Sequence, residues 1–444
     1  MSALRSLPPC LLTLLFLYVN GIQGIAIPTH GKVVACYVGS WAMYRAGDGK
    51  FVINDLKPEY CTHLIYAFAG LNSTSWEIQH LDSWADLQES GIGGYKRITS
   101  LRENYPGLKV SIAIGGWNEG SGNYSALAAD KSKRKIFIDS VIRFLRQHKF
   151  NGLDLDWEFP TERGGAPEDK KNFAVLVEEL KSDLSLHDYT LTAAISANKR
   201  IIGEAYDIPK ISKYLDYIHV MTYDYHGVWD SKVLPNAPLY SDDESNIDAT
   251  IKYLLELGAP SEKLVLGLPT YGRTFLLVQS VPRGISPIGK PAQQKGFKGP
   301  YTNEDGFMGF NEICKEVSSN SWITGWDNVS STPYAVNEQR VICYDDDRSL
   351  YKKVLYANNK NLAGVMIWTI DTDDFRGKCE NDYILMKSIN KAFKPNEIIS
   401  TTKRPNEIVP TTKRPNDGTS LHNPNNVQMI FCVIFISILT LVEF

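Results

Sequence analysis

Short apolar runs, rich in β-branched and aromatic residues, recur along the chain between residues 32 and 368. Continuous apolar runs of this length are typical of strands that are buried on both faces. We therefore expect eight strands, at residues 32–37, 63–68, 109–114, 151–159, 189–195, 217–222, 263–268 and 363–368.

Between several of these runs the hydrophobic pattern changes to a helical period. In residues 131–147 the apolar side chains fall on one face among lysines and arginines, and residues 168–186 and 244–258 also read as helices. Strands that alternate with helices indicate a parallel sheet that is covered on both faces. Eight such units favour an α/β fold of the closed (β/α)8 TIM-barrel type over an open doubly wound sheet.

The seventh and eighth predicted strands are separated by far more chain than one crossover helix needs. Residues 274–345 of this interval contain turns and short strand-like segments, such as 334–336 and 341–344. We expect them to form a small α+β insertion subdomain on the rim of the barrel.

Both ends of the chain look like processing or linker segments. Residues 1–24 carry one basic residue and an apolar run, as in a secretory signal peptide. Residues 25–394 form the expected globular domain. Residues 395–427 are rich in Thr and Pro and contain a ten-residue repeat, Asn396–Pro405, which returns almost unchanged, so they read as an extended stalk.

The last segment, residues 428–444, is apolar and only marginally long enough to cross a bilayer core of about 30 Å. Small residues at 416–420 and a polar spacer precede it, which is the layout of a GPI-attachment signal. A tail anchor and a secreted protein without any anchor are the alternatives. In each case we expect an extracellular protein, which contacts a membrane only through this C-terminal segment.

Cysteine usage agrees with export, because disulfides persist in oxidising compartments. Of the 7 cysteines, Cys10 lies in the signal segment and Cys432 in the tail, so an odd number remains in the domain and at least one thiol is unpaired. Three N-glycosylation sequons begin at Asn72, Asn123 and Asn328. The net charge of -3 gives no electrostatic reason to expect nucleic acid as a partner.

Three carboxylates occupy alternate positions of the fourth predicted strand: Asp154, Asp156 and Glu158. Alternate side chains of a strand share one face, here the interior and mouth of the barrel. Burying them together raises at least one pKa, which keeps a protonated acid available near neutral pH. A calcium loop would instead need a glycine turn and several oxygen ligands, so we expect no metal site.

Polar and aromatic residues also stand at the ends of other predicted strands. Tyr223 and Asp224 follow the sixth strand, Tyr271 and Arg273 follow the seventh, and Trp368 ends the eighth. Barrel enzymes assemble their active sites at this C-terminal rim. We therefore expect these residues to meet the carboxylates there.

The carboxylate segment, Gly-Leu-Asp-Leu-Asp-Trp-Glu at 152–158, resembles the Asp-Gly-x-Asp-x-Asp-x-Glu signature of family 18 chitinases. The resemblance extends from about residue 30 to 392 and is to the animal chitotriosidase and insect chitinase type. The other motifs follow in family order at residues 111–117, 221–227, 267–273 and 364–368.

This resemblance implies endo-hydrolysis of β-1,4-linked N-acetylglucosamine polymers with retention of configuration and without a cofactor. The nucleophile would be the substrate's own 2-acetamido carbonyl, an exception to the scheme with two enzyme carboxylates. Glu158 would be the general acid, and Asp156 would orient the acetamido N–H. Asp154 would share a proton with Asp156, and Tyr223 would hydrogen-bond the acetamido oxygen.

The resemblance also implies a set of sugar-binding residues and a disulfide pattern. Cys36 would pair with Cys61 and Cys314 with Cys379, which leaves Cys343 free, and we expect a monomer. The sugar-binding residues would be Tyr37, Trp41, Phe68, Gly116, Trp117, Phe159, Met221, Asp224, Trp229, Tyr271, Arg273 and Trp368.

Two positions depart from the family pattern. Asn151 stands where the signature has its first Asp, and Phe159 replaces the usual Tyr after the glutamate. Asn151 lacks the charge of that Asp, which we expect to brace the strand rather than to react. Phe159 keeps the ring but lacks the hydroxyl, and we expect this to weaken a substrate contact. A catalytically inactive chitin-binding lectin is the main alternative, although such proteins typically replace the acid that is retained here as Glu158. An endoglycosidase acting on N-glycan cores is a further alternative, but it usually lacks the rim subdomain.

Overall fold

The computed structural model describes residues 27–319 and 321–394. The predicted signal peptide, stalk and hydrophobic tail lie outside these residues. Within the described part of the chain, no helix is both long and apolar enough to cross a membrane.

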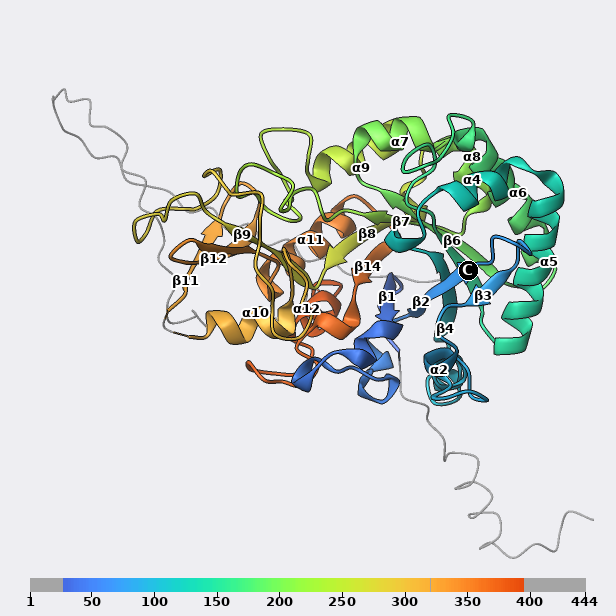
Figure 1. Cartoon of the computed structure of the whole chain (residues 1–444), viewed down its shortest axis with the longest axis horizontal. Helices are drawn as coiled ribbons and strands as arrows, with labels where there is room; N and C mark the ends of the chain where they lie inside the picture. Colours follow the sequence, from blue (N-terminus) through green and yellow to red (C-terminus); the bar gives the residue numbers. More distant parts are fainter. Residues whose placement is uncertain (1–26, 320, 395–444) are drawn as a thin grey trace, which may run out of the picture. The chain divides into compact units, whose positions relative to one another are not determined.

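Eight parallel strands close into a barrel (Figure 1). The strand order is β1-β14-β8-β7-β6-β5-β4-β2, and pairing of β1 with β2 closes the ring. All eight predicted strands are therefore confirmed, and so is the (β/α)8 barrel. The strands are β1 (Val33–Gly39), β2 (His63–Leu71), β4 (Lys109–Gly115), β5 (Gly152–Asp156), β6 (Thr190–Ser196), β7 (Tyr217–Met221), β8 (Leu264–Pro269) and β14 (Gly364–Trp368).

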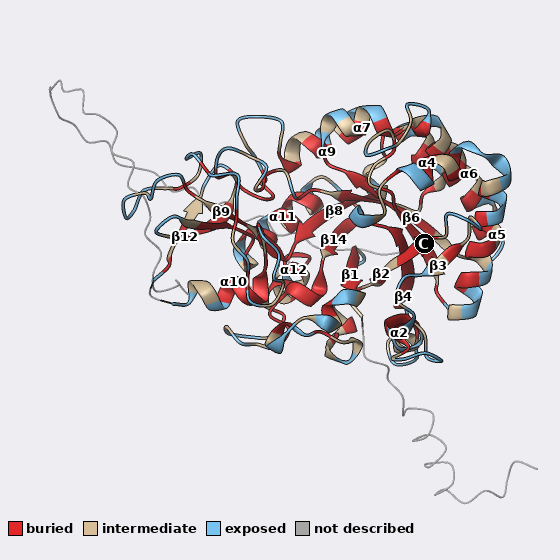
Figure 2. Ribbon diagram, viewed as in Figure 1, coloured by how far each residue is buried: buried red, intermediate tan, exposed pale blue. Residues whose placement is uncertain are grey.

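Helices fill most of the intervals between the strands, and each has a buried side and an exposed side (Figure 2). The longest, α5, begins where Asp130 accepts hydrogen bonds from the backbone N–H groups of Ser132 and Lys133. The predicted helices at 131–147, 168–186 and 244–258 correspond to α5, α6 and α9. The α-helices around the barrel are α2 (Ser83–Asp86), α3 (Gly94–Ser100), α4 (Gly122–Ala129), α5 (Lys131–His148), α6 (Asp169–Ser185), α7 (Lys199–Ala205), α8 (Ile208–Tyr214), α9 (Ile247–Glu256), α11 (Asp347–Asn359) and α12 (Ile384–Ala392).

Short elements complete the rim. The strand β3 (Ile78–His80) pairs antiparallel with β2. The 3-10 helices are η1 (Ser40–Tyr44), η2 (Gly47–Gly49), η3 (Ile53–Asp55), η4 (Pro58–Tyr60), η5 (Leu101–Glu103), η6 (Trp117–Glu119), η7 (Ser261–Lys263) and η8 (Ile370–Thr372).

Two hydrophobic layers hold the barrel together. The larger layer packs the outer faces of the strands against the helices, with α5 contributing Phe137 and Val141, both fully buried. The smaller layer fills the interior and includes Tyr37, Tyr223 and Tyr271. Because these tyrosines share the interior with the carboxylates, the barrel core leads directly into the polar site.

The insertion between β8 and β14 is a five-stranded antiparallel sheet with one helix, as expected for an α+β subdomain. Its first strand, β9, begins at Tyr271, three residues before the predicted start at 274, and it follows β8 almost without a break. The elements are β9 (Tyr271–Leu276), β10 (Phe307–Gly309), α10 (Phe310–Val317), β11 (Ile323–Asp327), β12 (Thr332–Asn337) and β13 (Arg340–Cys343).

Two disulfides are present, with the pairing that the resemblance implies. Cys36–Cys61 joins β1 to the segment before β2, and Cys314–Cys379 joins α10 of the insertion to the segment after β14. Cys343 is free and buried, and burial raises the pKa of its thiol. The disulfides agree with an extracellular location, where such bonds persist.

The three sequons lie in turns or at a helix start. Asn72 is in the turn between β2 and β3, where its Oδ1 accepts hydrogen bonds from the backbone of Thr74 and Ser75. Asn123, in the first turn of α4, and Asn328, in the turn between β11 and β12, are exposed. Their glycosylation stays a prediction.

Candidate active site

The carboxylate segment runs along β5 and past its end. β5 ends at Asp156, which is opposite Gly115 of β4, so the predicted strand at 151–159 is too long. Asp154 and Asp156 are buried inside the barrel, whereas Glu158 is half-buried in the segment that follows. The carboxylates thus extend from the barrel interior to its rim.

Asp154 is fully buried and held by three polar side chains. Tyr37 Oη donates a hydrogen bond of 2.6 Å to its Oδ2, and Thr192 Oγ1 donates one of 2.5 Å to its Oδ1. His219 Nδ1 lies 3.1 Å from Oδ1 and 3.2 Å from Tyr37 Oη. These contacts compensate for the burial of a carboxylate at this position.

Asp156 and Glu158 both have raised pKa values. Burial raises the pKa of Asp156 well above its usual range, and the charges of Glu158 and Asp154 raise it further. Burial and the charge of Asp224 raise the pKa of Glu158 to about 7, while the charge of Arg163 lowers it. Oδ1 of Asp156 is buried without a hydrogen-bond partner. The expected shift of at least one carboxylate is therefore confirmed in direction.

The residues after β7 and at the start of β9 form a second polar group. Tyr271 Oη donates a hydrogen bond of 2.7 Å to Asp224 Oδ1, and Arg273 Nε donates one of 2.8 Å to the same oxygen. Tyr223 is buried beside them, with its Oη 3.6 Å from Met366 Sδ. Met221, the last residue of β7, packs against the same interior cluster.

Four aromatic rings gather at the ends of β1, β2 and β14. The ring of Trp368 lies 5.4 Å from that of Tyr37, 6.1 Å from that of Trp41 and 5.9 Å from that of Phe68. Trp41 stacks on Phe68 with an interplanar angle of 12°. A Cβ on Gly116 would lie 2.8 Å from the Phe68 ring, so only glycine allows this approach. The structure brings these predicted residues together.

Three other predicted sugar-binding residues lie at the rim. Trp117, in η6, is 58% exposed and has the guanidinium of Arg163 3.6 Å from its ring centroid. Trp229 is 51% exposed, 5.2 Å from the Arg273 guanidinium. Phe159 is half-buried, and its carbonyl accepts a hydrogen bond from Ser121 Oγ. Exposed flat rings of this kind suit stacking against a sugar.

Four residues that contact the site or lie close to it are not among the site residues predicted from the sequence. Thr192 is the partner of Asp154 in the register of β5 and β6, and His219 reaches the same carboxylate from β7. Asn236 accepts the backbone N–H of Asp224. Arg163 follows Glu158 in the same loop. Thr192 and His219 carried a usable signal, because both lie on predicted strands of the barrel, whereas Asn236 and Arg163 lie outside the predicted strands.

Asn151, which replaces the first Asp of the signature, joins β5 to β4. Its Oδ1 accepts a hydrogen bond of 2.8 Å from the backbone N–H of Val110, and its own N–H donates to the Val110 carbonyl. It therefore makes contacts that brace the strand.

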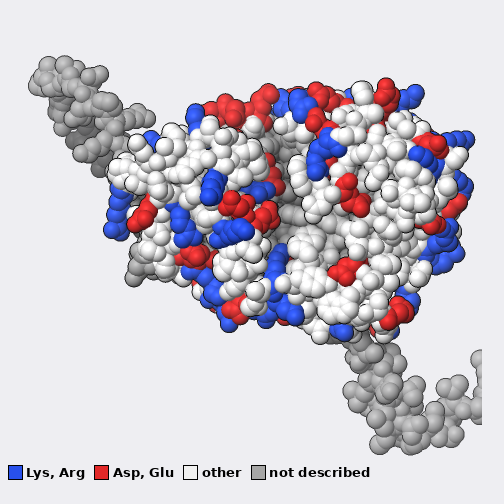
Figure 3. All heavy atoms as spheres, viewed as in Figure 1, with Lys and Arg blue, Asp and Glu red and all other residues white. Residues whose placement is uncertain are grey.

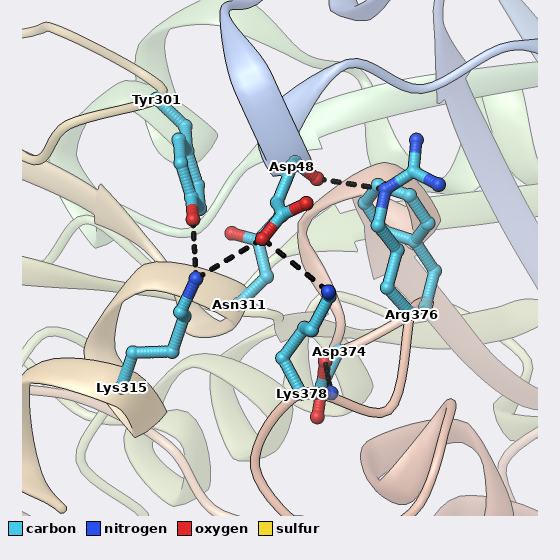
Figure 4. A pocket seen from close by; sticks show the side chains of 8 residues that line it. Asp48, Tyr301, Asn311, Lys315, Asp374, Arg376 and Lys378 are labelled. Carbon is cyan, nitrogen blue, oxygen red and sulfur yellow. Dashed lines mark hydrogen bonds and ion pairs between the residues drawn. The ribbon is translucent and has the colours of Figure 1, made fainter.

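A small pocket of about 10 Å³ lies where the insertion meets the barrel, and its volume admits about one water molecule (Figure 4). Lys315 of α10 lies 3.2 Å from the Asp48 carboxylate, and Lys378 lies 3.7 Å from it. Arg376 donates to the Asp48 carbonyl. None of the predicted site residues lines this pocket. We interpret its charged residues as a polar link between the insertion and the barrel.

The surface near the middle of the face in Figure 3 is hollowed, and uncharged residues cover most of the recess. Charged side chains gather mainly around its edges (Figure 3). A recess of this character suits an uncharged polymer better than a polyanion.

Comparisons with known proteins agree with this geometry. The model of the family "Glycosyl hydrolases family 18" matches residues 33–373. The chain is similar to "Probable chitinase 2" of Drosophila melanogaster, with 50% identity over 80% of this chain and 75% of that protein. It is similar to "Endochitinase" of Manduca sexta, with 38% identity over 81% of this chain and 67% of that protein.

A solved structure is also similar, the Ostrinia furnacalis Group IV chitinase in complex with allosamidin. Its TM-score is 0.79 at 40% identity, and the match covers 82% of this chain and 99% of that one. The chain belongs to glycosyl hydrolase family 18.

Proposed function

We propose that this protein is a chitinase that cuts internal β-1,4 linkages of N-acetylglucosamine polymers with retention of configuration. The observation that carries the proposal is the carboxylate series that begins in β5 and continues past its end to Glu158, whose pKa is raised to about 7. A group with this pKa is protonated in much of the enzyme near neutral pH and can act as a general acid.

Glu158 protonates the glycosidic oxygen as the bond to the leaving sugar breaks. Its position past the end of β5 places the carboxyl at the rim, where a polymer can reach it. The same group, now deprotonated, accepts the proton of the water that completes hydrolysis.

The nucleophile is the carbonyl of the substrate's own 2-acetamido group. Asp156 retains an unused acceptor at Oδ1 for the acetamido N–H. Tyr223 donates to the acetamido oxygen and so holds the attack geometry. Asp154 shares a proton with Asp156, and its own hydrogen bonds from Tyr37 and Thr192 keep it in place.

The remaining side chains bind sugar. Asp224, with Tyr271 and Arg273, offers a polar wall to the reacting residue, and Trp368 forms its floor. The exposed rings of Trp41, Trp117 and Trp229 serve as stacking platforms along the polymer.

The test is incubation of the protein with defined chitooligosaccharides, with product lengths and anomeric form followed over time. Internal cleavage with retention supports the proposal, and fully deacetylated oligomers, which lack the acetamido carbonyl, should stay intact. Binding without any product would leave the chitin-binding lectin as the function.

The pH dependence of kcat/KM should show an alkaline limb with a midpoint near pH 7. Glu158 must be protonated to act, its pKa is raised to about 7, and activity is therefore present below this pH and lost above it. In Asp224→Asn the limb should move to lower pH, because the charge of Asp224 helps to raise the pKa of Glu158. An unchanged midpoint in this variant would contradict the assignment.

We also propose that the mature protein is held at the cell surface by a GPI anchor attached near residues 416–420, with the Thr- and Pro-rich residues from 395 to the attachment site as its stalk. The support is the small-residue site, polar spacer and apolar end of the sequence. Treatment of expressing cells with a phosphoinositide-specific phospholipase should release the enzyme. Retention in the membrane would indicate a tail anchor, and spontaneous secretion would indicate no anchor.

A further inference from the structure

Arg163 occupies an unusual place beside the candidate acid. It lies in the loop after β5, is exposed, and adopts a left-handed backbone with a φ of 51°. Residues other than glycine are uncommon in this region, so local contacts have to hold it there.

The contacts of Arg163 join two segments at the rim of the barrel, one that carries Trp117 and one that carries Glu158. Its guanidinium lies 3.6 Å from the centroid of the Trp117 ring. Nη1 donates to the Trp117 carbonyl at 2.7 Å and to the Glu158 carbonyl at 3.1 Å. One planar side chain thus holds both the indole and the backbone of the loop that carries the acid.

The base of the same loop is held independently. Asp169, at the start of α6, is fully buried and accepts hydrogen bonds from the N–H of Ala166 at 2.7 Å and from Ser125 Oγ at 2.7 Å. The loop that carries Arg163 is therefore anchored at its C-terminal end by Asp169. The guanidinium of Arg163 connects this loop to the Trp117 ring.

The stack leaves Trp117 available. Its side chain is 58% exposed although the guanidinium covers one face of the indole. A cation on one face of the ring restricts its rotation and leaves the opposite face for a sugar.

We propose that Arg163 is a positioning residue, which holds Trp117 in the orientation that stacks on substrate and ties it to the Glu158 loop. This inference rests on the proposed function, because it takes Trp117 to be a sugar platform. Arg163 acts on the sugar through Trp117 and makes no substrate contact of its own.

The test is a double-mutant cycle on chitooligosaccharide binding, measured by calorimetry in a Glu158→Gln background so that no turnover is needed. Arg163→Gln should weaken binding about three- to tenfold, in line with a cation–π contact and two hydrogen bonds at an exposed site. In a Trp117→Ala background the same change should have almost no effect. An equal loss in both backgrounds would overturn the proposal and indicate direct contact with substrate.

Two further variants separate position from charge. Arg163→Lys keeps the charge but loses the planar fork, so it should lower affinity like Arg163→Gln yet leave the alkaline limb of the active enzyme unmoved. Arg163→Gln should shift that limb to higher pH, because a nearby positive charge is lost. Arg143→Gln, on α5 and paired with Glu77, is the matched control and should change neither readout.

These results distinguish the two proposals. If the active protein releases no product but binds oligomers, the proposed hydrolysis fails, while the binding cycle still tests Arg163. If hydrolysis is normal and Arg163→Gln binds like its parent, only the positioning role fails.

Discussion

Glu158→Gln should lower the rate of chitooligosaccharide hydrolysis by about 100- to 10,000-fold, the range that general acid catalysis contributes. Glutamine keeps the size of the side chain and its capacity for hydrogen bonding but has no carboxyl proton to donate. Binding should change little, because the aromatic platforms are untouched. Initial rates and calorimetric affinities on the same oligomer measure the two effects separately.

Folding is the necessary control for this variant. The folded protein holds the pKa of Glu158 above its usual value. The free energy of unfolding therefore falls as pH rises from that usual value to about 7, because the ionised carboxyl is less favourable in the folded state. Glutamine carries no charge and removes this destabilisation. The Tm of Glu158→Gln at pH 8 should therefore equal or exceed that of the wild type. Glu162→Gln, in the same loop and paired with Arg200, should keep near-normal activity. A Glu158→Gln variant with normal turnover would refute the assignment of the acid.

Asp156→Asn should reduce kcat by about 100- to 1,000-fold, which is typical for the loss of one group that stabilises charge in a transition state. Asparagine cannot exchange a proton with Asp154, and it stabilises the positive charge on the acetamido group less well. Asp139→Asn gives a matched control, because it removes one carboxylate from the exposed side of helix α5, where Asp139 pairs with Lys135. A loss of less than about tenfold would contradict the role of Asp156.

Much of the fold could be predicted because its signals are local. A strand that is buried on both faces has to be apolar over its whole length, so runs such as 109–114 and 263–268 are visible without any partner. The alternation of Asp154, Asp156 and Glu158 likewise has a period of two and needs no tertiary information.

Other features depended on contacts between distant segments. β5 stops at Asp156 because its neighbour β4 offers a partner only as far as Gly115, and the carboxylate pattern continues beyond that point. The insertion begins at Tyr271 because β9 pairs with β10 and β13, which lie far along the chain. Neither boundary has a local marker.

The order of apolar and polar residues along the chain was thus sufficient to predict the barrel, the insertion and the row of carboxylates, because each produces a pattern within its own stretch of sequence. Tertiary structure alone decided the surroundings of those carboxylates, namely the three partners of Asp154 and the effect of the Asp224 charge on Glu158. It also decided the contact of the Arg163 guanidinium with the Trp117 ring. The reason is that a pKa and a ring orientation depend on charges, burial and contacts across space, and folding places these side by side from segments far apart in the sequence.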